Sequence, residues 1–185
     1  MKKVLIIITL TFVFFSISLP CRAEWDIRFF GINVHDFEDR NWAPVIIGGL
    51  SSFAVHELGH YTAAELTGMD ASFKWDSGPV VWADGYDDKS DSTKLFFHAG
   101  GFLAQSLVGS IITAVPYTRH SDFAVGFTGF TMVENSMYGI VNHRNNEYSD
   151  VSNLSRLGWN GTGFALGNGL LNGVLLYINL NKSEK

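Results

Sequence analysis

Four stretches of the chain contain almost no charged side chains. Residues 41–55, 95–118 and 157–181 hold no Asp, Glu, Lys or Arg, and residues 123–143 hold only Glu134. A helix that crosses a lipid bilayer needs about 20 mainly apolar residues, so the second and fourth stretches are long enough. The other two qualify if their polar side chains face the interior of a helix bundle. This pattern predicts an all-α protein, a polytopic membrane helix bundle of about four hydrophobic helices.

Glycines recur at four-residue spacing in the last of these stretches, as Gly163/Gly167 and Gly169/Gly173. In lipid, small residues at that spacing let two helix backbones approach closely. Together with the apolar ending LLNGVLLYINL, this spacing favours a membrane helix. The alternative is a soluble loop followed by a strand, because asparagines also occur in the stretch.

The segment between the first and second stretches is acidic. Residues 70–94 contain six Asp, and turn residues flank a short β-favouring core in SGPVVWADG. We therefore predict a short two-stranded β-hairpin at the membrane surface. The Asp spacing does not match a calcium-binding EF-hand loop, so a solvated acidic connector is the better interpretation and a Ca²⁺ site is a remote alternative.

The first 23 residues have the layout of a secretory signal peptide. Lys2 and Lys3 precede an apolar stretch, residues 4–19, and small residues at the −3 and −1 positions place cleavage after Ala23. An uncleaved signal anchor is the alternative. We expect residues 24–185 to form a single membrane-embedded domain, because four hydrophobic stretches leave little room for a separate soluble domain.

Composition narrows the classes of protein that fit this pattern. Charged residues make up 17% and hydrophobic residues 46% of the 185-residue chain, which argues against intrinsic disorder. The 13 Lys and Arg against 18 Asp and Glu, with a pI of about 5.6, argue against a nucleic-acid partner. The single Cys excludes a disulfide framework and a cysteine-based zinc site. We expect an integral membrane protein of the bacterial inner (cytoplasmic) membrane, with the lipid bilayer as its surroundings.

The motif HELGH, residues 56–60, places two histidines four residues apart. Residues at that spacing lie on one face of a helix, so the imidazoles of His56 and His60 can reach one metal ion. Glu57 would lie beside the same ion, where a carboxylate can act as the general base that accepts a proton from water. We expect Zn²⁺ as the cofactor, because it lowers the pKa of a bound water to about 7. Polar side chains inside a hydrophobic stretch are costly without partners, which favours a metal site over an ordinary surface helix.

A catalytic zinc site needs a third protein ligand and leaves its fourth position open. Ala63 and Leu66 show that the metzincin pattern is absent, and Glu65 follows too closely on the same helix. The best candidate is Asp150, in the segment EYSDVSNL at the start of the last hydrophobic stretch. The alternative role of Ser149 and Asp150 is to cap the N-terminus of a helix.

Three further side chains are candidates for supporting roles. His98 would face the substrate or lie in a helix interface. Glu134, inside the third hydrophobic stretch, would act in the site or form a hydrogen bond with a neighbouring helix. Asn153, three residues after Asp150, would orient that carboxylate or cap a helix.

These residues resemble those of a known family. FAVHELGHYTAAELTG is similar to the first active-site helix of the intramembrane site-2 proteases, peptidase family M50. HAGGFLAQ, residues 98–105, stands in a place similar to the family's second element, A-G-P-x-x-N, and the acidic connector corresponds to the family's hairpin region. The resemblance covers residues 44–170. It implies that Asp150 is the third zinc ligand and that the protein hydrolyses peptide bonds of membrane or membrane-proximal protein substrates.

The chain departs from the family pattern at three points. Gly101 stands where the family has Pro, Asp150 is not followed by the family's Gly, and no PDZ-like module is present. The leading hypothesis is a membrane-embedded zinc metalloendopeptidase in which Glu57 activates the water. The alternative of another class is a non-proteolytic M50-like membrane scaffold or binding protein, and a third hypothesis is a soluble periplasmic zinc protease. The sequence predicts no particular substrate, membrane orientation or oligomeric state.

Overall fold

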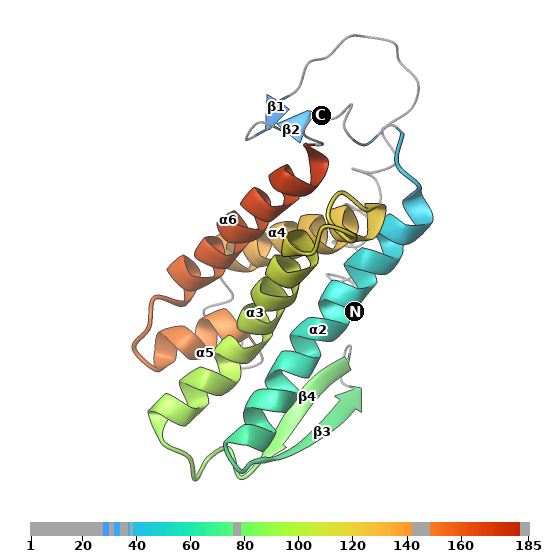
Figure 1. The fold of residues 1–185 in the computed structure, drawn as a ribbon. Helices are drawn as coiled ribbons and strands as arrows, with labels where there is room; N and C mark the ends of the chain where they lie inside the picture. Colours follow the sequence, from blue (N-terminus) through green and yellow to red (C-terminus); the bar gives the residue numbers. More distant parts are fainter. Residues whose placement is uncertain are drawn as a thin grey trace.

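The computed structural model describes residues 28–29, 32–33, 37, 39–75, 79–141 and 149–181. Long helices pack along one another, and a short helix and a β-hairpin lie toward one end of the bundle (Figure 1). The predicted signal peptide, residues 1–23, lies outside the described residues. The elements are β1 (Arg28–Phe29), β2 (Ile32–Asn33), α2 (Trp42–Leu66), β3 (Asp70–Trp75), β4 (Pro79–Asp84), α3 (Asp91–Ala114), α4 (Asp122–Val141), α5 (Asp150–Arg156) and α6 (Gly161–Leu180).

The mostly helical class predicted from the charge-free stretches is confirmed. Each of the four stretches lies mainly within one long helix, α2, α3, α4 or α6. The loop-and-strand alternative for the last stretch is wrong, because α6 is a continuous helix. Its first turn is closed by Asn160, whose side chain accepts a hydrogen bond from the backbone N–H of Gly163.

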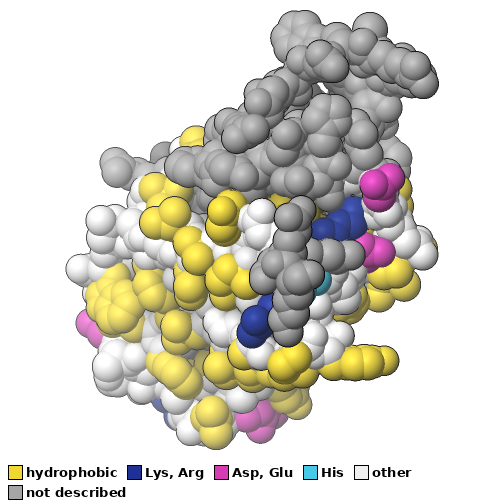
Figure 2. Space-filling model, turned by 45° about the horizontal axis from the view of Figure 1, so that its top comes forward, with side chains coloured by type: hydrophobic (Ala, Val, Ile, Leu, Met, Phe, Trp, Pro, Cys, Tyr) yellow, Lys and Arg dark blue, Asp and Glu magenta, His cyan; other side chains and the backbone are white. Residues whose placement is uncertain are grey.

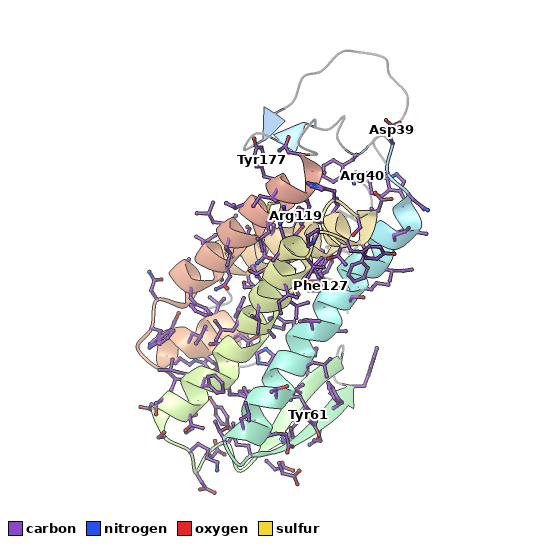
Figure 3. The ribbon with its side chains drawn as sticks, viewed as in Figure 1. Asp39, Arg40, Tyr61, Arg119, Phe127 and Tyr177 are labelled. Atoms are coloured by element: carbon purple, nitrogen blue, oxygen red, sulfur yellow. The ribbon has the colours of Figure 1, made fainter. Side chains whose placement is uncertain are left out.

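The acidic connector forms the predicted β-hairpin. β3 and β4 pair in antiparallel fashion, with Phe73 opposite Val81. Ala71 of β3 is buried in a hydrophobic cluster that also contains Ala64 of α2 and Phe97 of α3, and Val81 packs against it. The hairpin is therefore seated on the end of α2 and the start of α3, beside Tyr61, which Figure 3 labels.

The opposite end of the bundle is closed by polar contacts. Arg40, just before α2, forms an ion pair of 3.2 Å with Asp122, the first residue of α4. The same guanidinium donates a 3.0 Å hydrogen bond to the carbonyl of His120. Figure 3 shows Arg40 at the end of the bundle remote from Tyr61, so these contacts hold the starts of α2 and α4 together far from the hairpin.

Glycines allow helix backbones to touch at two crossings. A Cβ placed on Gly59 of α2 would overlap the carbonyl of Gly100 of α3, so the two backbones touch at this crossing. A Cβ on Gly126 of α4 would likewise overlap the carbonyl of Val45 in α2. The first of these crossings brings α3 against α2 at the HELGH motif.

The glycine pairs of α6 differ in what they contact. Gly169 and Gly173 face α4, where a Cβ would meet the side chains of Ser136 and Met132. A Cβ on Gly167 would meet nothing within 4 Å, and one on Gly163 would meet its own helix cap. Within the described chain, the prediction of a close helix approach is therefore confirmed for the second pair and wrong for the first.

The bundle has a partly polar interior and an outer surface rich in large apolar side chains. Polar side chains are buried between the helices, whereas the outward faces carry large apolar side chains. Leu50, Leu107, Ile140 and Leu170, one from each long helix, are 67%, 63%, 71% and 64% exposed, and Figure 2 shows hydrophobic side chains spread over one face of the molecule. The buried polar side chains include Ser52, Gln105, Thr131, Asn135, Asn172 and Asn179.

Among the described residues, two helices, α3 and α6, are long and apolar enough to cross a membrane. A buried helix of a water-soluble protein also meets this criterion. The distribution of polar and apolar side chains across the bundle is thus the stronger observation on its surroundings.

Candidate metal centre

Three side chains from distant parts of the chain converge inside the bundle. His56 and His60 lie one turn apart on α2, and Asp150 is the first residue of α5. Nε2 of His56 lies 3.1 Å from Nε2 of His60, and Oδ2 of Asp150 lies 3.4 and 3.2 Å from these two atoms. Both imidazoles are buried. The structure therefore brings together the three residues that the sequence analysis selected as metal ligands.

The spacing of the three atoms fits a tetrahedral metal ion. Zinc binds nitrogen and oxygen at about 2.0–2.2 Å, so two ligands of a regular tetrahedron lie about 3.3–3.6 Å apart. The 3.4 Å separation lies within that range, and the 3.1 and 3.2 Å separations are shorter than its lower end by about 0.2 Å or less. Two imidazoles and one carboxylate form a donor set that zinc accepts, with the fourth position left for water.

Hydrogen bonds on the far side of each ring turn its free nitrogen toward the centre. Nδ1 of His60 lies 2.8 Å from the carbonyl oxygen of Phe97, which can only accept, so this nitrogen carries the proton. Nδ1 of His56 lies 3.1 Å from Oε1 of Gln105, also an acceptor. In the neutral rings both Nε2 lone pairs then point, with Asp150 Oδ2, at one spot. These lone pairs repel one another unless a cation lies between them, so the residues present fit a divalent metal.

Gln105 is a site residue that the sequence analysis missed. Its Nε2 donates to the carbonyl of Ser52 and, at 2.7 Å, to Oε2 of Glu134, which leaves Oε1 as the acceptor for His56. Glu134 thus makes the hydrogen bond with a neighbouring helix that the sequence analysis considered, and through it anchors the amide that orients His56. The signal available in the sequence was a polar residue two helical turns after His98, on the same face of an apolar helix.

Gly101 provides the space in which the ligand atoms meet. A Cβ at this position would lie 2.6 Å from Nε2 of both His56 and His60. The backbone of α3 therefore forms one wall of the centre, and this wall is brought close by the crossing of Gly59 and Gly100 just before it. Gly101 departs from the family pattern, which has Pro at this position, but glycine has no side chain and therefore does not block the site.

Asp150 is free to face the centre because its neighbour caps the helix. The side chain of Ser149 accepts a hydrogen bond from the backbone N–H of Ser152, so the predicted capping role belongs to Ser149. Val151 and Leu154 of the same short helix are buried in one cluster with Ala99, Phe102 and Ala165. This packing holds α5 between α3 and α6 and directs its first residue inward.

The carboxyl group of Asp150 is ionised. Burial by itself raises the pKa of this group, but in the metal-free protein the charge of a protonated His60 and hydrogen bonds from His56, His60 and His98 hold the pKa well below its ordinary value. The negative charge would complement a cation bound between the three donor atoms.

The second oxygen of Asp150 is bound by His98. Nδ1 of His98 lies 3.0 Å from Oδ1 of Asp150, and Nε2 of the same ring lies 2.9 Å from the hydroxyl of Tyr86. The sequence predicted that Asn153 orients Asp150 or caps a helix. Asn153 makes a hydrogen bond with Arg156 at 3.5 Å, and His98 makes the contact with Asp150 that is expected of an orienting residue.

Glu57 lies beside the two histidines on α2 and is partly buried. Val81 of β4 lies beside its carboxylate. The hairpin therefore borders the metal centre at the residue predicted to be the general base.

The described elements define a helical protein with a buried two-histidine, one-aspartate centre that could hold a metal ion. No protein-family model, curated protein or solved structure matches the chain. A function is therefore argued from the geometry of the centre and the polarity of the bundle.

Proposed function

We propose that the protein is a membrane-embedded zinc metalloendopeptidase similar to the site-2 proteases of peptidase family M50. The observation that carries the proposal is the convergence of His56, His60 and Asp150 on one point beside Glu57. The order of these residues, an HExxH helix followed by a distant Asp in a later helix, is the order that the resemblance implies.

The chemistry divides between the metal and the side chains. Bound here, Zn²⁺ supplies the Lewis acidity that lowers the pKa of a water molecule to about 7. His56, His60 and Asp150 hold the ion, while Glu57 takes a proton from the attacking water and returns it to the departing amine. A substrate helix has to unwind locally before its peptide carbonyl is accessible, because that carbonyl is hydrogen-bonded within a helix.

The apolar outer surface and partly polar interior of the bundle support a place in the bilayer. Leucines and isoleucines on the outward faces of all four long helices would be costly in water but are compatible with lipid. Helices in lipid gain little from apolar contact with one another, so small residues and hydrogen bonds hold them together. Described interhelical hydrogen bonds of this kind are Ser52–Thr131 (2.6 Å), Ser106–Asn168 (2.8 Å) and Thr113–Asn179 (2.9 Å).

The metal centre would then lie at membrane depth. His56 is near the middle of α2, which runs from Trp42 to Leu66, and a rise of about 1.5 Å per residue puts it roughly 20 Å from the start of the helix. We propose that α2, α3, α4 and α6 all cross the membrane, the inner membrane of a bacterium. The substrate is a membrane or membrane-proximal protein.

The test of the proposal is Glu57→Gln in the full chain, purified in detergent and offered fluorogenic single-helix membrane substrates. Because the amide cannot accept the proton, we expect cleavage to fall about 10²–10⁴-fold. Zinc content should stay at one ion per chain, since the three ligands are untouched. Glu65→Gln is the matched control, because Glu65 is an exposed carboxylate on the same helix. Its side chain accepts a hydrogen bond from the backbone N–H of Ala71.

The outcomes separate the rival functions. Unchanged cleavage in Glu57→Gln would contradict the mechanism. Zinc binding without cleavage of any substrate in the wild type would favour the non-proteolytic membrane scaffold. Release of the protein from carbonate-washed membranes would favour the soluble protease, whereas retention supports the membrane bundle.

A further inference from the structure

Tyr86 lies in the acidic connector just after β4, yet its hydroxyl reaches the interior of the protein. This hydroxyl lies 2.9 Å from Nε2 of His98, and Nδ1 of His98 lies 3.0 Å from Oδ1 of Asp150. A continuous chain of hydrogen bonds therefore runs from the hairpin region to the third ligand of the proposed metal site.

The chemistry of the groups sets the direction of these hydrogen bonds. An ionised carboxylate only accepts, so Nδ1 of His98 donates to Asp150. In the neutral imidazole Nε2 then carries no proton and accepts from the hydroxyl of Tyr86. Tyr86 thereby selects the tautomer of His98 that donates to Asp150.

Asp150 uses its two oxygens differently as a result. Oδ2 lies 3.4 and 3.2 Å from the Nε2 atoms of His56 and His60, and Oδ1 is held by His98. A carboxylate with Oδ1 free could rotate or bind a metal through both oxygens. With Oδ1 held, it offers one atom to the centre at a fixed position.

The start of α3 orients two of the three ligands from adjacent residues. The carbonyl of Phe97 accepts from Nδ1 of His60, and the side chain of His98 donates to Asp150. His98 is buried, and no solvent is needed to complete either contact.

Ring packing, in addition to the hydrogen bond with His98, holds Tyr86 in position. Its ring meets those of Phe97 and His98 edge to face, with centroids 5.9 and 5.6 Å apart, and Nζ of Lys94 lies 5.1 Å from its centroid. The ring also packs against the hydrophobic cluster that seats the hairpin. The position of the hydroxyl therefore depends on the hairpin.

We propose that Tyr86 and His98 are positioning residues of the metal centre, which hold Asp150 as a ligand through one oxygen. The proposal rests on the metal site of the proposed function and extends that site to the connector. A purely structural role is the competing explanation, because both rings are packed.

The experiment compares His98→Leu, His98→Asn and Tyr86→Phe with wild type, each as the full chain in detergent. Zinc affinity is measured by competition with a chelating dye, and the visible absorption of the Co²⁺-loaded protein reports the ligand geometry. Tyr61→Phe is the matched control, because it makes the same chemical change as Tyr86→Phe. The ring of Tyr61 stacks on that of Phe73 in the β3–β4 hairpin, with centroids 5.3 Å apart.

The expected losses follow the role of each group. His98→Leu should lower zinc affinity about 10- to 100-fold, as for other groups that orient metal ligands, and shift the Co²⁺ absorption. His98→Asn should restore most of the affinity, because Nδ2 of Asn can donate from nearly the position of Nδ1. Tyr86→Phe removes one neutral hydrogen bond and should cost about 2- to 12-fold. Tyr61→Phe should match wild type in both measurements.

A double-mutant cycle separates positioning from structure. If His98 acts through Asp150, His98→Leu should change zinc affinity by no more than about 2-fold in an Asp150→Ala background. An equal loss in both backgrounds would overturn the proposal in favour of a structural role. Wild-type affinity and Co²⁺ absorption in His98→Leu would also overturn it.

The proposal and the function on which it rests fail in distinguishable ways. If the wild-type protein binds zinc but cleaves no substrate, the proposed peptidase function is wrong. The affinity measurements then still decide whether Tyr86 and His98 position Asp150. A wild-type protein that binds neither Zn²⁺ nor Co²⁺ overturns both.

Discussion

Gly101→Ala places a methyl group at the wall of the metal centre. The new Cβ would lie 2.6 Å from Nε2 of His56 and from Nε2 of His60. Non-bonded heavy atoms need about 3.5 Å, so each contact would be roughly 0.9 Å too short. The atoms that would have to move are the proposed ligand atoms themselves.

The magnitude follows from the tolerance of the site. Distances between zinc and its ligands vary by only about 0.2 Å, several times less than the required displacement. We expect zinc affinity to fall on the order of 100-fold. Overpacking should also lower the free energy of unfolding of the metal-free protein by about 1–3 kcal/mol. This loss exceeds the roughly 0.8–1.0 kcal/mol by which Ala is preferred to Gly within a helix.

The assay measures zinc per chain, dye competition and the midpoint of thermal unfolding in detergent. Gly167→Ala is the matched control, because a Cβ at Gly167 of α6 would meet nothing within 4 Å. That variant should bind zinc as wild type does and unfold at an equal or slightly higher temperature. The pair thus makes the same chemical change inside and outside the centre.

One result would refute the reasoning. If Gly101→Ala binds one zinc per chain with wild-type affinity, the imidazole nitrogens do not meet at this wall of α3, and the proposed ligand geometry is wrong. A loss of stability without a loss of zinc affinity would place the clash elsewhere in the helix crossing.

Two further predictions concern the same centre. Gln105→Leu removes the acceptor for Nδ1 of His56, so we expect zinc affinity to fall about 10- to 100-fold in the same dye competition; unchanged affinity would show that Gln105 does not orient the ring. Removal of the metal with a chelator should lower the unfolding midpoint of the wild type, because a ligand present at 1,000 times its Kd stabilises the folded state by about 4 kcal/mol. Added zinc should restore the midpoint, and His60→Ala should show no zinc-dependent shift; a zinc-dependent shift of equal size in that variant would contradict binding at this site.

Local patterns made part of the structure predictable. The charge-free stretches marked the four long helices, since an uninterrupted apolar stretch of that length has few other solutions. The turn residues of the connector marked the β3–β4 hairpin. The pairing of His56 with His60 also follows from local geometry, because helical residues four apart share a face.

Other parts depended on which helices pack together. The spacing of Gly163 and Gly167 is the same as that of Gly169 and Gly173, yet only the second pair faces α4. The acidic connector looked like a solvated loop, but Tyr86 within it reaches His98. Spacing records which residues share a face of one helix and carries no information on which face meets a neighbour.

The sequence by itself determined the helical class, the hairpin and two of the three proposed ligands, because each rests on contacts within a few residues. Tertiary structure decided the rest. Asp150 is 94 residues from His56, and it meets the histidines only because Ser149 caps α5 and the packing of that helix turns its first residue inward. The backbone wall at Gly101 and the hydrogen bonds of the two histidines with Phe97 and Gln105 exist only once α3 crosses α2, and the hydrogen bond of His98 with Asp150 exists only once α5 packs on α3. Side chains from separate elements acquire a common geometry through packing, and no pattern within one element specifies it.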